Sequence, residues 1–230
     1  MLSAEKAKNR WPDRTALQGW ACDSGGFTHV ARHGGWTRSA AEHADLVRWF
    51  ADRSPGMDWA APQDWMCEPF VLSKTGLTLA EHQHRTVDNL LLLREAAPEI
   101  NWIPVLQGYE VRDYYSCWKM YEAAGVDLNA EPLVGVGSVC RRQNSNEIEL
   151  LFYNLFMDGL RCHGFGVKLR GLDDYKQYLQ SADSHAWSVA AQYARRPVCG
   201  STTHKTCSSC DVFAHAWYED IRARCNLPVL

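Results

Sequence analysis

Short apolar stretches alternate with amphipathic segments of helical period along the chain, and this alternation limits the possible folds more than any other feature. The apolar stretches, each interpreted as a strand, are residues 20–26, 57–65, 101–108, 132–138, 161–168 and 180–186. The amphipathic segments, interpreted as helices, are residues 39–54, 78–98, 111–125, 145–159 and 171–181. Because strand–helix units repeat, we expect parallel strands joined by right-handed crossovers.

Two of these helices carry a start signal in the sequence. Ser39 is followed by Glu42, and Thr78 is followed by Glu81. A serine or threonine at this spacing from a glutamate is typical of a capping box, in which each side chain bonds the backbone N–H of the other residue. We therefore predict that helices begin directly after Ser39 and Thr78.

The residues at the strand ends distinguish two α/β folds that both fit this pattern. A doubly wound sheet binds its ligand at one switch point, whereas a (β/α)8 barrel builds its active site from the C-terminal ends of many strands. Almost every predicted strand ends in a polar residue or glycine: Asp23, Gln63, Asp64, Gln107, Gly135, Gly137, Lys168 and Asp183. The set as a whole favours an α/β fold of the TIM-like (β/α)8 barrel type, although any one of these residues also fits a role as a helix or turn cap.

Composition excludes several classes of protein. The chain has 230 residues, 46% of them hydrophobic, and a net charge of −3. Any contact with nucleic acid therefore needs a local basic patch rather than bulk positive charge. No apolar run approaches the ~20 residues of a membrane span, and the first residues lack the apolar core of a signal peptide. Nine cysteines without an export signal predict a reducing, cytoplasmic location.

A cluster of metal-binding residue types lies near the C-terminus, in "CGSTTHKTCSSC" at 199–210. Its candidate ligands are Cys199, His204, Cys207 and Cys210. Four nitrogen and sulfur ligands in one short segment suit a tetrahedral structural zinc ion. A lone CxxC is also compatible with redox chemistry or chance. We predict two parts of the chain: a catalytic barrel over 1–196, and a zinc-binding segment with a C-terminal helix over 197–230.

Five short motifs occur in an order that resembles the tRNA-guanine transglycosylases, the queuine tRNA-ribosyltransferase superfamily. They are "DSGGF" (23–27), "VLQG" (105–108), "GVGS" (135–138), "HGFGVK" (163–168) and "SADS" (181–184). The stretches "WAAPQDWMCEP", "MYEAAGVDL", "GVGSVCRRQ" and "SADSHAWS" are similar to one branch in particular. That branch, DpdA-like, occurs in phages and actinobacteria and inserts 7-deazaguanine bases into DNA. The resemblance extends over about residues 18 to 217 and, for a phage protein, implies the host cytoplasm.

The resemblance implies an exchange of bases at an N-glycosidic bond. Asp183 falls where the family has its nucleophilic aspartate, which traps the sugar carbon as a covalent aspartyl-glycosyl intermediate. Asp23 is then the general acid and base for the departing and entering bases, and it also contacts the base edge. The glycines after Asp23 are interpreted as a freely turning backbone that a base approaches closely without meeting a Cβ atom.

Further roles in the pocket follow from the same resemblance. Ser24 and Gly25 are substrate-binding candidates beside Asp23. Gln107 and Gly108 are expected at the carbonyl edge of the base, and Gly135 or Gly137 at its amine edge. Phe165 is expected against the ring, with an ordinary core aromatic as the alternative. The second recognition carboxylate is either Asp64 or Glu68, and we prefer Glu68.

The implied partners are DNA and a 7-deazaguanine base such as preQ0 or preQ1. Two alternatives stay open: a transglycosylase acting on tRNA, and an inactive barrel that binds nucleic acid or a partner. Local cations that fit a phosphate backbone, or simply a solvated surface, are Arg141, Arg142, Lys168, Arg170, Arg195, Arg196 and Lys205.

The sequence departs from the family in two ways. Only 22 residues precede Asp23, and six predicted strands are fewer than the eight of a closed barrel. Two explanations stay open: the barrel is incomplete at its N-terminus, or the start of the sequence was assigned too late. An incomplete barrel has an open sheet edge, which a second copy of the chain or a partner subunit would cover. The tRNA enzymes also supply their zinc-binding histidine well after the last cysteine, so either His204 or His215 takes that place here.

Overall fold

The computed structural model describes residues 2–3, 19–140, 142, 146–194 and 196–225. Its strands within these ranges are β1 (Leu2–Ser3), β2 (Trp20–Asp23), β3 (Met57–Ala60), β4 (Val105–Leu106), β5 (Val134–Val136), β6 (Cys162–Gly164) and β7 (Ser181–Ala182). Its helices are α2 (Gly26–His33), α3 (Ala40–Arg53), α4 (Pro69–Thr75), α5 (Leu79–Ala96), α6 (Val111–Ala123), α7 (Asn146–Met157), α8 (Leu169–Tyr175), η1 (Lys176–Tyr178), α9 (Ala186–Ala194) and α10 (Asp211–Cys225).

The strands form two parallel sheets in chain order. One sheet has the order β1-β2-β3 and the other β4-β5-β6-β7. An isolated parallel bridge between Ala60 and Trp102 connects the end of β3 to the segment before β4. The described strands thus follow one another without the reversal of order that a doubly wound sheet has at its switch point. Among the described residues, no ladder pairs β7 with β1.

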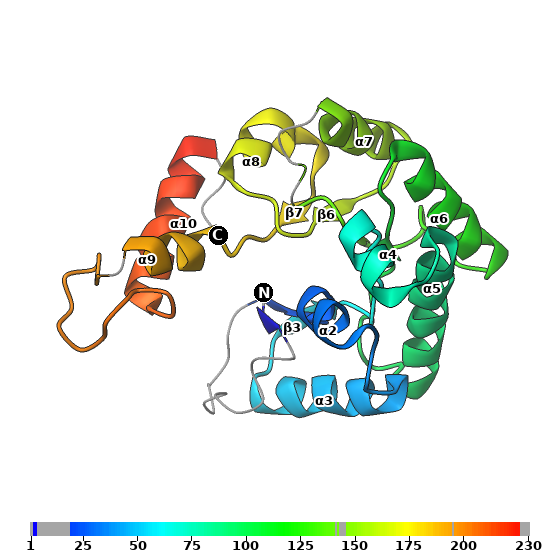
Figure 1. Ribbon diagram of the computed structural model, residues 1–230, viewed down its shortest axis with the longest axis horizontal. Coiled ribbons are helices and arrows are strands. Elements are labelled where there is room, and N and C mark those ends of the chain that lie inside the picture. The colour runs from blue at the N-terminus through cyan, green and yellow to red at the C-terminus, as the bar shows by residue number, and fades with distance from the viewer. Residues whose placement is uncertain (1, 4–18, 141, 143–145, 195, 226–230) are drawn as a thin grey trace.

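A layer of helices lies outside the strands. Figure 1 shows α3, α5, α6, α7 and α8 in an arc, with β3, β6 and β7 on its inner side. The main core lies between these layers and includes Leu90 of α5, Tyr121 of α6 and Phe152 of α7, all fully buried. The Tyr121 hydroxyl accepts a bond from the Val105 N–H and donates one to the Val105 carbonyl oxygen, so α6 holds β4 directly.

The predicted helix starts are confirmed. The Glu42 N–H donates to Ser39 Oγ at 3.3 Å and the Ser39 N–H donates to Glu42 Oε2 at 2.8 Å, at the start of α3. Thr78 and Glu81 form the same reciprocal pair at the start of α5. Each box satisfies N–H groups that the first turn of a helix otherwise leaves without a partner.

The six predicted strands are all present but shorter than predicted. The stretch 180–186, interpreted as one strand, contains only β7 and then begins α9 at Ala186. Four elements were not predicted: β1, α2, α4 and α9. Helix α10 lies within 197–230, where a C-terminal helix was expected. Helix α4 lies just beyond a stretch interpreted as a strand and begins at Pro69, a residue favoured in the first helical turn.

Helices α9 and α10 contact each other at one end of the arc, and α10 also contacts α8. Of the helices in the described ranges, none has both the length and the apolar character needed to cross a bilayer.

Candidate active site

The C-terminal ends of the strands open into one cavity of about 620 Å³. Eight of the ten catalytic and substrate-binding candidates line it, together with the alternative carboxylate Asp64: Asp23, Ser24, Gly25, Glu68, Gln107, Gly137, Phe165 and Asp183. They come from the ends of β2, β4, β5, β6 and β7 and from the segment before α4. Because neighbouring strands run parallel, their C-terminal ends lie at the same edge of the sheet, and residues distant in the chain meet there.

Asp23 is the last residue of β2 and sits in a carboxylate-rich part of this cavity. Burial raises the pKa of Asp23 to about 7, and the negative charges of Asp64 and Asp183 contribute to the same shift. A carboxyl group with this pKa exchanges its proton near neutral pH, which is the property of a general acid and base.

Asp183 follows β7 and is held differently. The Gly166 N–H donates to Asp183 Oδ1 at 2.8 Å, and His163 Nε2 lies 3.5 Å from the same oxygen. Burial raises the pKa of Asp183, but the His163 contact and the Gly166 hydrogen bond outweigh it, so the pKa lies below its ordinary value. Asp183 is therefore an anion at neutral pH, in the same cavity as a carboxyl group that is half protonated.

A chain of hydrogen bonds crosses the cavity floor. Ser24 Oγ donates to Asp64 Oδ1 at 2.8 Å, and Gln107 Nε2 donates to Asp64 Oδ2 at 2.6 Å. Ser138 Oγ lies 2.7 Å from Gln107 Oε1 and 2.8 Å from Glu68 Oε2. Asp64 and Gln107 are buried, so these bonds fix the orientation of the Gln107 amide.

Sequence reasoning preferred Glu68 to Asp64, and both line the cavity. Asp64 is the one bonded to the Gln107 side chain, and burial raises its pKa. Ser138 was not singled out, although it follows Gly137 in the motif "GVGS". It has a positive φ of 56°, and its hydroxyl also accepts a bond from the Cys67 N–H.

The glycines after Asp23 have a different explanation from the freely turning backbone that the sequence indicated. Gly25 is the N-cap of α2 with φ 76°, a left-handed conformation that favours glycine. A Cβ atom on Gly26 would lie 2.9 Å from Asp64 Oδ1. The two glycines therefore allow a helix to begin directly behind Asp23 and let Asp64 approach the backbone.

The remaining glycine candidates divide into two kinds. A Cβ atom on Gly137 would lie 2.3 Å from Gln107 Nε2 inside the cavity. Gly108 and Gly135 are not among the residues that line it. A Cβ atom would lie 2.8 Å from the Tyr114 backbone nitrogen at Gly108, and 2.4 Å from Phe165 Cε2 at Gly135. At Gly108 and Gly135, close packing outside the cavity lining leaves no room for a Cβ atom.

Phe165 lines the cavity as part of an aromatic group. Its ring centroid lies 4.8 Å from that of His163 and 6.3 Å from that of Trp59 on β3. Trp59 also contacts His163, with centroids 4.8 Å apart. The ring of Phe165 is thus held at the cavity wall by its two aromatic neighbours.

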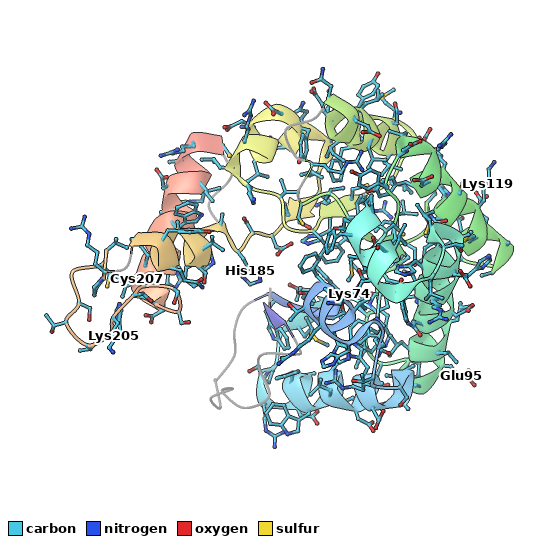
Figure 2. All side chains as sticks on the ribbon, in the orientation of Figure 1. Lys74, Glu95, Lys119, His185, Lys205 and Cys207 are labelled. Atoms are coloured by element: carbon cyan, nitrogen blue, oxygen red, sulfur yellow. The ribbon has the colours of Figure 1, made fainter. Side chains whose placement is uncertain are left out.

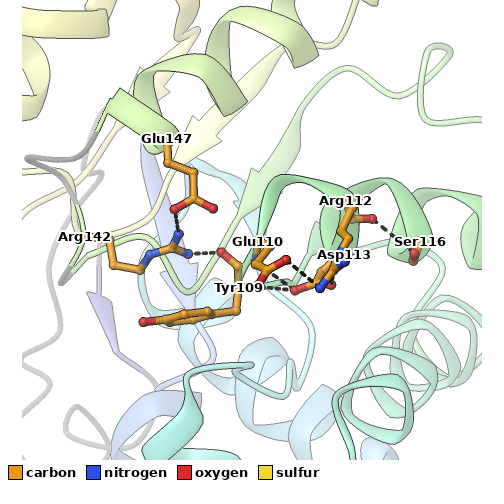
Figure 3. Close-up of polar contacts among 7 residues, drawn as sticks. All are labelled: Tyr109, Glu110, Arg112, Asp113, Ser116, Arg142 and Glu147. Carbon is orange, nitrogen blue, oxygen red and sulfur yellow. Dashed lines mark hydrogen bonds and ion pairs between the residues drawn. The ribbon is translucent and has the colours of Figure 1, made fainter.

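The segment after Gln107 is anchored by two sets of polar contacts (Figure 3). Asp113 Oδ2 accepts bonds from the Tyr109 and Glu110 N–H groups at the start of α6. Arg142 donates to the Tyr109 carbonyl oxygen and to Glu147, and its guanidinium lies over the Tyr109 ring. Arg142, a phosphate candidate by sequence, therefore braces the segment next to Gln107.

The other predicted cations differ in position. Lys168 is exposed and lines the cavity. His185 also lines the cavity, and Figure 2 shows it on the inner side of the arc. Arg170, Arg196 and Lys205 are exposed elsewhere, and Arg141 and Arg195 lie outside the described residues. Residues of α9 and α10, including Tyr193 and Trp217, complete the cavity wall.

The four predicted metal ligands come together. One ligand atom from each of Cys199, His204, Cys207 and Cys210 lies within 4.8 Å of all the others. His204 Nε2 is 3.4 Å from Cys199 Sγ and 3.3 Å from Cys207 Sγ. Sulfur ligands at about 2.3 Å from a tetrahedral zinc ion lie roughly 3.8 Å apart, so the group has the size of a metal site. His215 is not part of it.

Comparison with known proteins adds one positive result. A comparison with curated proteins finds no match. A family model described as "DpdA: DeoxyPurine in DNA protein A" matches residues 6–229. That range contains both aspartates, the hydrogen-bonded chain on the cavity floor and the cysteine and histidine cluster. The chain belongs to the DpdA family, which is the branch related to tRNA-guanine transglycosylases that places deazaguanines in DNA.

Proposed function

We propose that this protein replaces guanine in DNA with a 7-deazaguanine derivative through a covalent aspartyl-glycosyl intermediate. The observation that carries the proposal is the contrast between two carboxyl groups in one cavity. The pKa of Asp23 is raised to about 7 while that of Asp183 is lowered. Carboxyl groups whose environments separate their pKa values in this way are suited to different roles in one reaction.

In the first half of the reaction, Asp183 is the nucleophile. Its carboxylate forms a bond to C1′ of the target nucleotide as the bond from C1′ to the guanine nitrogen breaks, and the electron pair of that bond leaves with the base. Asp23, protonated, gives its proton to the departing guanine. An anionic Asp183 and a protonated Asp23 coexist near neutral pH because of their separated pKa values.

In the second half, the deazaguanine takes the place of guanine. Asp23, now a carboxylate, removes the proton from the entering ring nitrogen, and that nitrogen attacks C1′. The bond between C1′ and Asp183 breaks, and its electron pair returns to the carboxylate. Two displacements at one carbon retain its configuration, as in retaining glycosidases, and the proton given in the first half is recovered.

The base is read by the floor of the cavity. Gln107 and Asp64 are buried and bonded to each other, so the donors and acceptors that they present are fixed. A base that fails to satisfy such groups leaves them unpaired at a cost of about 1–3 kcal/mol each. We assign Asp64, with Glu68 beside it, to the base edge, Gly137 to the close approach, and Phe165 to the ring face.

We also propose that the strands curl into an incomplete (β/α)8 barrel. Trp59 of β3 contacts His163 of β6, with ring centroids 4.8 Å apart, although β4 and β5 lie between them in the strand order. The charge of Asp183, after β7, acts on Asp23 of β2. These contacts between strands far apart in the order support a strongly curved sheet with the site at its C-terminal end.

The cysteine and histidine cluster is proposed to hold a structural zinc ion. All four side chains are soft or borderline ligands, and no carboxylate takes part, so the set fits zinc in a closed tetrahedral site. The ion would close the loop at 199–210 on itself, and this loop packs against α9 and α10 through Cys207 and Cys210. We propose that the zinc-binding part of the chain begins at residue 197.

Transfer of a labelled base tests the proposal. The protein is mixed with duplex DNA, single-stranded DNA or tRNA together with radiolabelled guanine, preQ0 or preQ1, and the label bound to nucleic acid is counted. We expect label in DNA, with single strands favoured because a duplex base has to be flipped out. Label in tRNA alone would support the tRNA alternative, and no label in any nucleic acid would support the inactive binding module.

A further inference from the structure

A histidine outside the predicted site residues contacts the proposed nucleophile. His163 lies in the middle of β6 and is 3% exposed. Its Nε2 atom is 3.5 Å from Asp183 Oδ1 and is buried without a hydrogen-bond partner among the described residues, whereas its Nδ1 atom is 2.8 Å from Ser181 Oγ. The imidazole thus stands between a hydroxyl and a carboxylate.

The strand register explains how these three side chains meet. His163 pairs with Ser181 where β6 and β7 run side by side, and cross-strand pairs of this kind place side chains next to each other. Asp183 lies two residues after Ser181, so it emerges on the same face of the strand. The rings of Trp59 and Phe165 contact the imidazole, each with centroids 4.8 Å away, and limit its rotation.

Both contacts that hold Asp183 involve the same carboxylate oxygen. The Gly166 N–H and His163 Nε2 both approach Oδ1, and no contact within the described part of the chain engages Oδ2. A carboxylate held through one oxygen has a fixed plane, and its other oxygen stays available for a bond to a substrate.

We propose that His163 is a positioning residue: with the Gly166 amide it holds Oδ1 of Asp183, so that Oδ2 is the oxygen that attacks C1′. Its Nε2 atom carries the hydrogen, and its Nδ1 atom accepts one from the Ser181 hydroxyl. The inference rests on the proposed function for the identity of the attacked carbon, whereas the contact itself is independent of it.

The same contact aids the second displacement. When the bond between C1′ and Oδ2 breaks, negative charge returns to the Asp183 carboxylate. Hydrogen bonds to a charged group are stronger than those to a neutral one. The Gly166 N–H, together with the His163 N–H as it closes from 3.5 Å, therefore stabilises the leaving carboxylate more than the ester. His163 is therefore expected to affect turnover rather than the affinity for DNA.

Direct titration of the Asp183 carboxyl group tests the contact without any need for activity. The full chain is labelled with ¹³C at aspartate carboxyl carbons, and the Asp183 signal is identified by its loss in Asp183→Asn. The parent, His163→Phe and His163→Gln are then compared. Phenylalanine keeps an aromatic ring without a donor, whereas the Gln side-chain amide nitrogen takes up nearly the position of Nε2.

We expect the Asp183 signal to titrate at higher pH in His163→Phe, because the carboxylate loses a donor, and close to the parent in His163→Gln. The other titratable groups on this cavity stay in place in each variant: Asp23, Asp64, Glu68, Cys140, Lys168, His185 and Tyr193. An unchanged titration in His163→Phe would overturn the inference.

Kinetics then separate this inference from the proposed function. We expect the single-turnover rate of base exchange to fall about 10- to 100-fold in His163→Phe and to recover in part in His163→Gln. The acid limb of the pH–rate profile should move to higher pH in His163→Phe, and the affinity for DNA should stay unchanged. His43→Gln is the control, because it removes another fully buried imidazole from α3. A parent rate in His163→Phe would overturn the positioning role. A shifted titration with a parent that never exchanges bases would keep the contact and reject the proposed function.

Discussion

At the scale of single residues, the site depends on two aspartates that follow strands β2 and β7. Asp23 lies near other carboxylates, whereas the Oδ1 atom of Asp183 accepts a backbone N–H bond and faces an imidazole. The same side chain therefore has a proton to give in one position and a negative charge in the other. This difference has consequences for stability as well as for catalysis.

The raised pKa of Asp23 predicts a pH-dependent effect of Asp23→Asn. Folding raises this pKa from its ordinary 3.8 to about 7, so the folded state binds a proton that the unfolded state has released. The stability of the parent therefore falls as pH rises from about 4 to 7. We expect Asp23→Asn to have the higher Tm at pH 8, and the difference to shrink toward pH 4, in thermal unfolding across this range.

Asp183→Asn is the matched control, because its expected effect on stability has the opposite dependence on pH. Folding lowers the pKa of Asp183, so its carboxylate stabilises the protein at neutral pH, and this contribution is lost as the pH falls through its folded-state pKa. The variant should melt below the parent at pH 7. A Tm difference for Asp23→Asn that stays constant from pH 4 to 8 would contradict the assigned environment.

Gly137→Ala tests the close approach in the cavity. The added Cβ atom would lie 2.3 Å from Gln107 Nε2, so the amide has to move and loses its bond to Asp64. We expect affinity for the free base to fall about tenfold or more, measured by calorimetry. Gly108→Ala is the comparison, because its Cβ atom meets the Tyr114 backbone and should lower Tm instead. Parent affinity in Gly137→Ala would remove Gln107 and Gly137 from the base pocket.

At the scale of elements, the sequence predicted what local chemistry determines. Ser39 and Thr78 marked the starts of α3 and α5 because a capping box is a local signal, and six strands were found from their apolar runs. Helix α2 was missed because Gly25 and Gly26, which are usual turn residues, here cap and begin a helix. The contact between His163 and Asp183 was also missed, because it depends on the register of β6 and β7 and not on a motif.

The cysteine and histidine cluster packs against two helices that complete the cavity wall. Cys207 and Cys210 pack with Ala191 of α9 and Phe213 of α10. We expect one zinc ion per chain by elemental analysis, its loss in Cys207→Ser, and its retention in Cys140→Ser. Amide hydrogen exchange in the metal-free chain should become faster in α9 and α10 and stay slow in α5. A purified parent without zinc, or a Cys207→Ser variant that keeps it, would contradict this assignment.

At the scale of the whole molecule, the cavity is shared by strands from β2 to β7. The sequence predicted the approximate positions of the strands. It also predicted a site at the C-terminal ends of the strands, because each predicted strand ends in polar residues or glycine. That Asp23, Asp64, Gln107 and Asp183 line one cavity depends on the spatial arrangement of the strands, which no single stretch of sequence specifies. The orientation of the Asp183 carboxylate depends on the Gly166 N–H group, which the identity of a side chain does not encode.

The most direct test of the account is the covalent adduct between protein and DNA. The parent, Asp23→Asn and Asp183→Asn are each mixed with DNA, denatured, and examined by gel and by intact mass, with and without a 7-deazaguanine base. We expect an adduct in the parent that the added base removes, and none in Asp183→Asn, which lacks the attacking carboxylate. Asp23→Asn should form adduct about 10²–10⁴-fold more slowly. An Asp183→Asn variant that traps DNA as well as the parent would contradict the account.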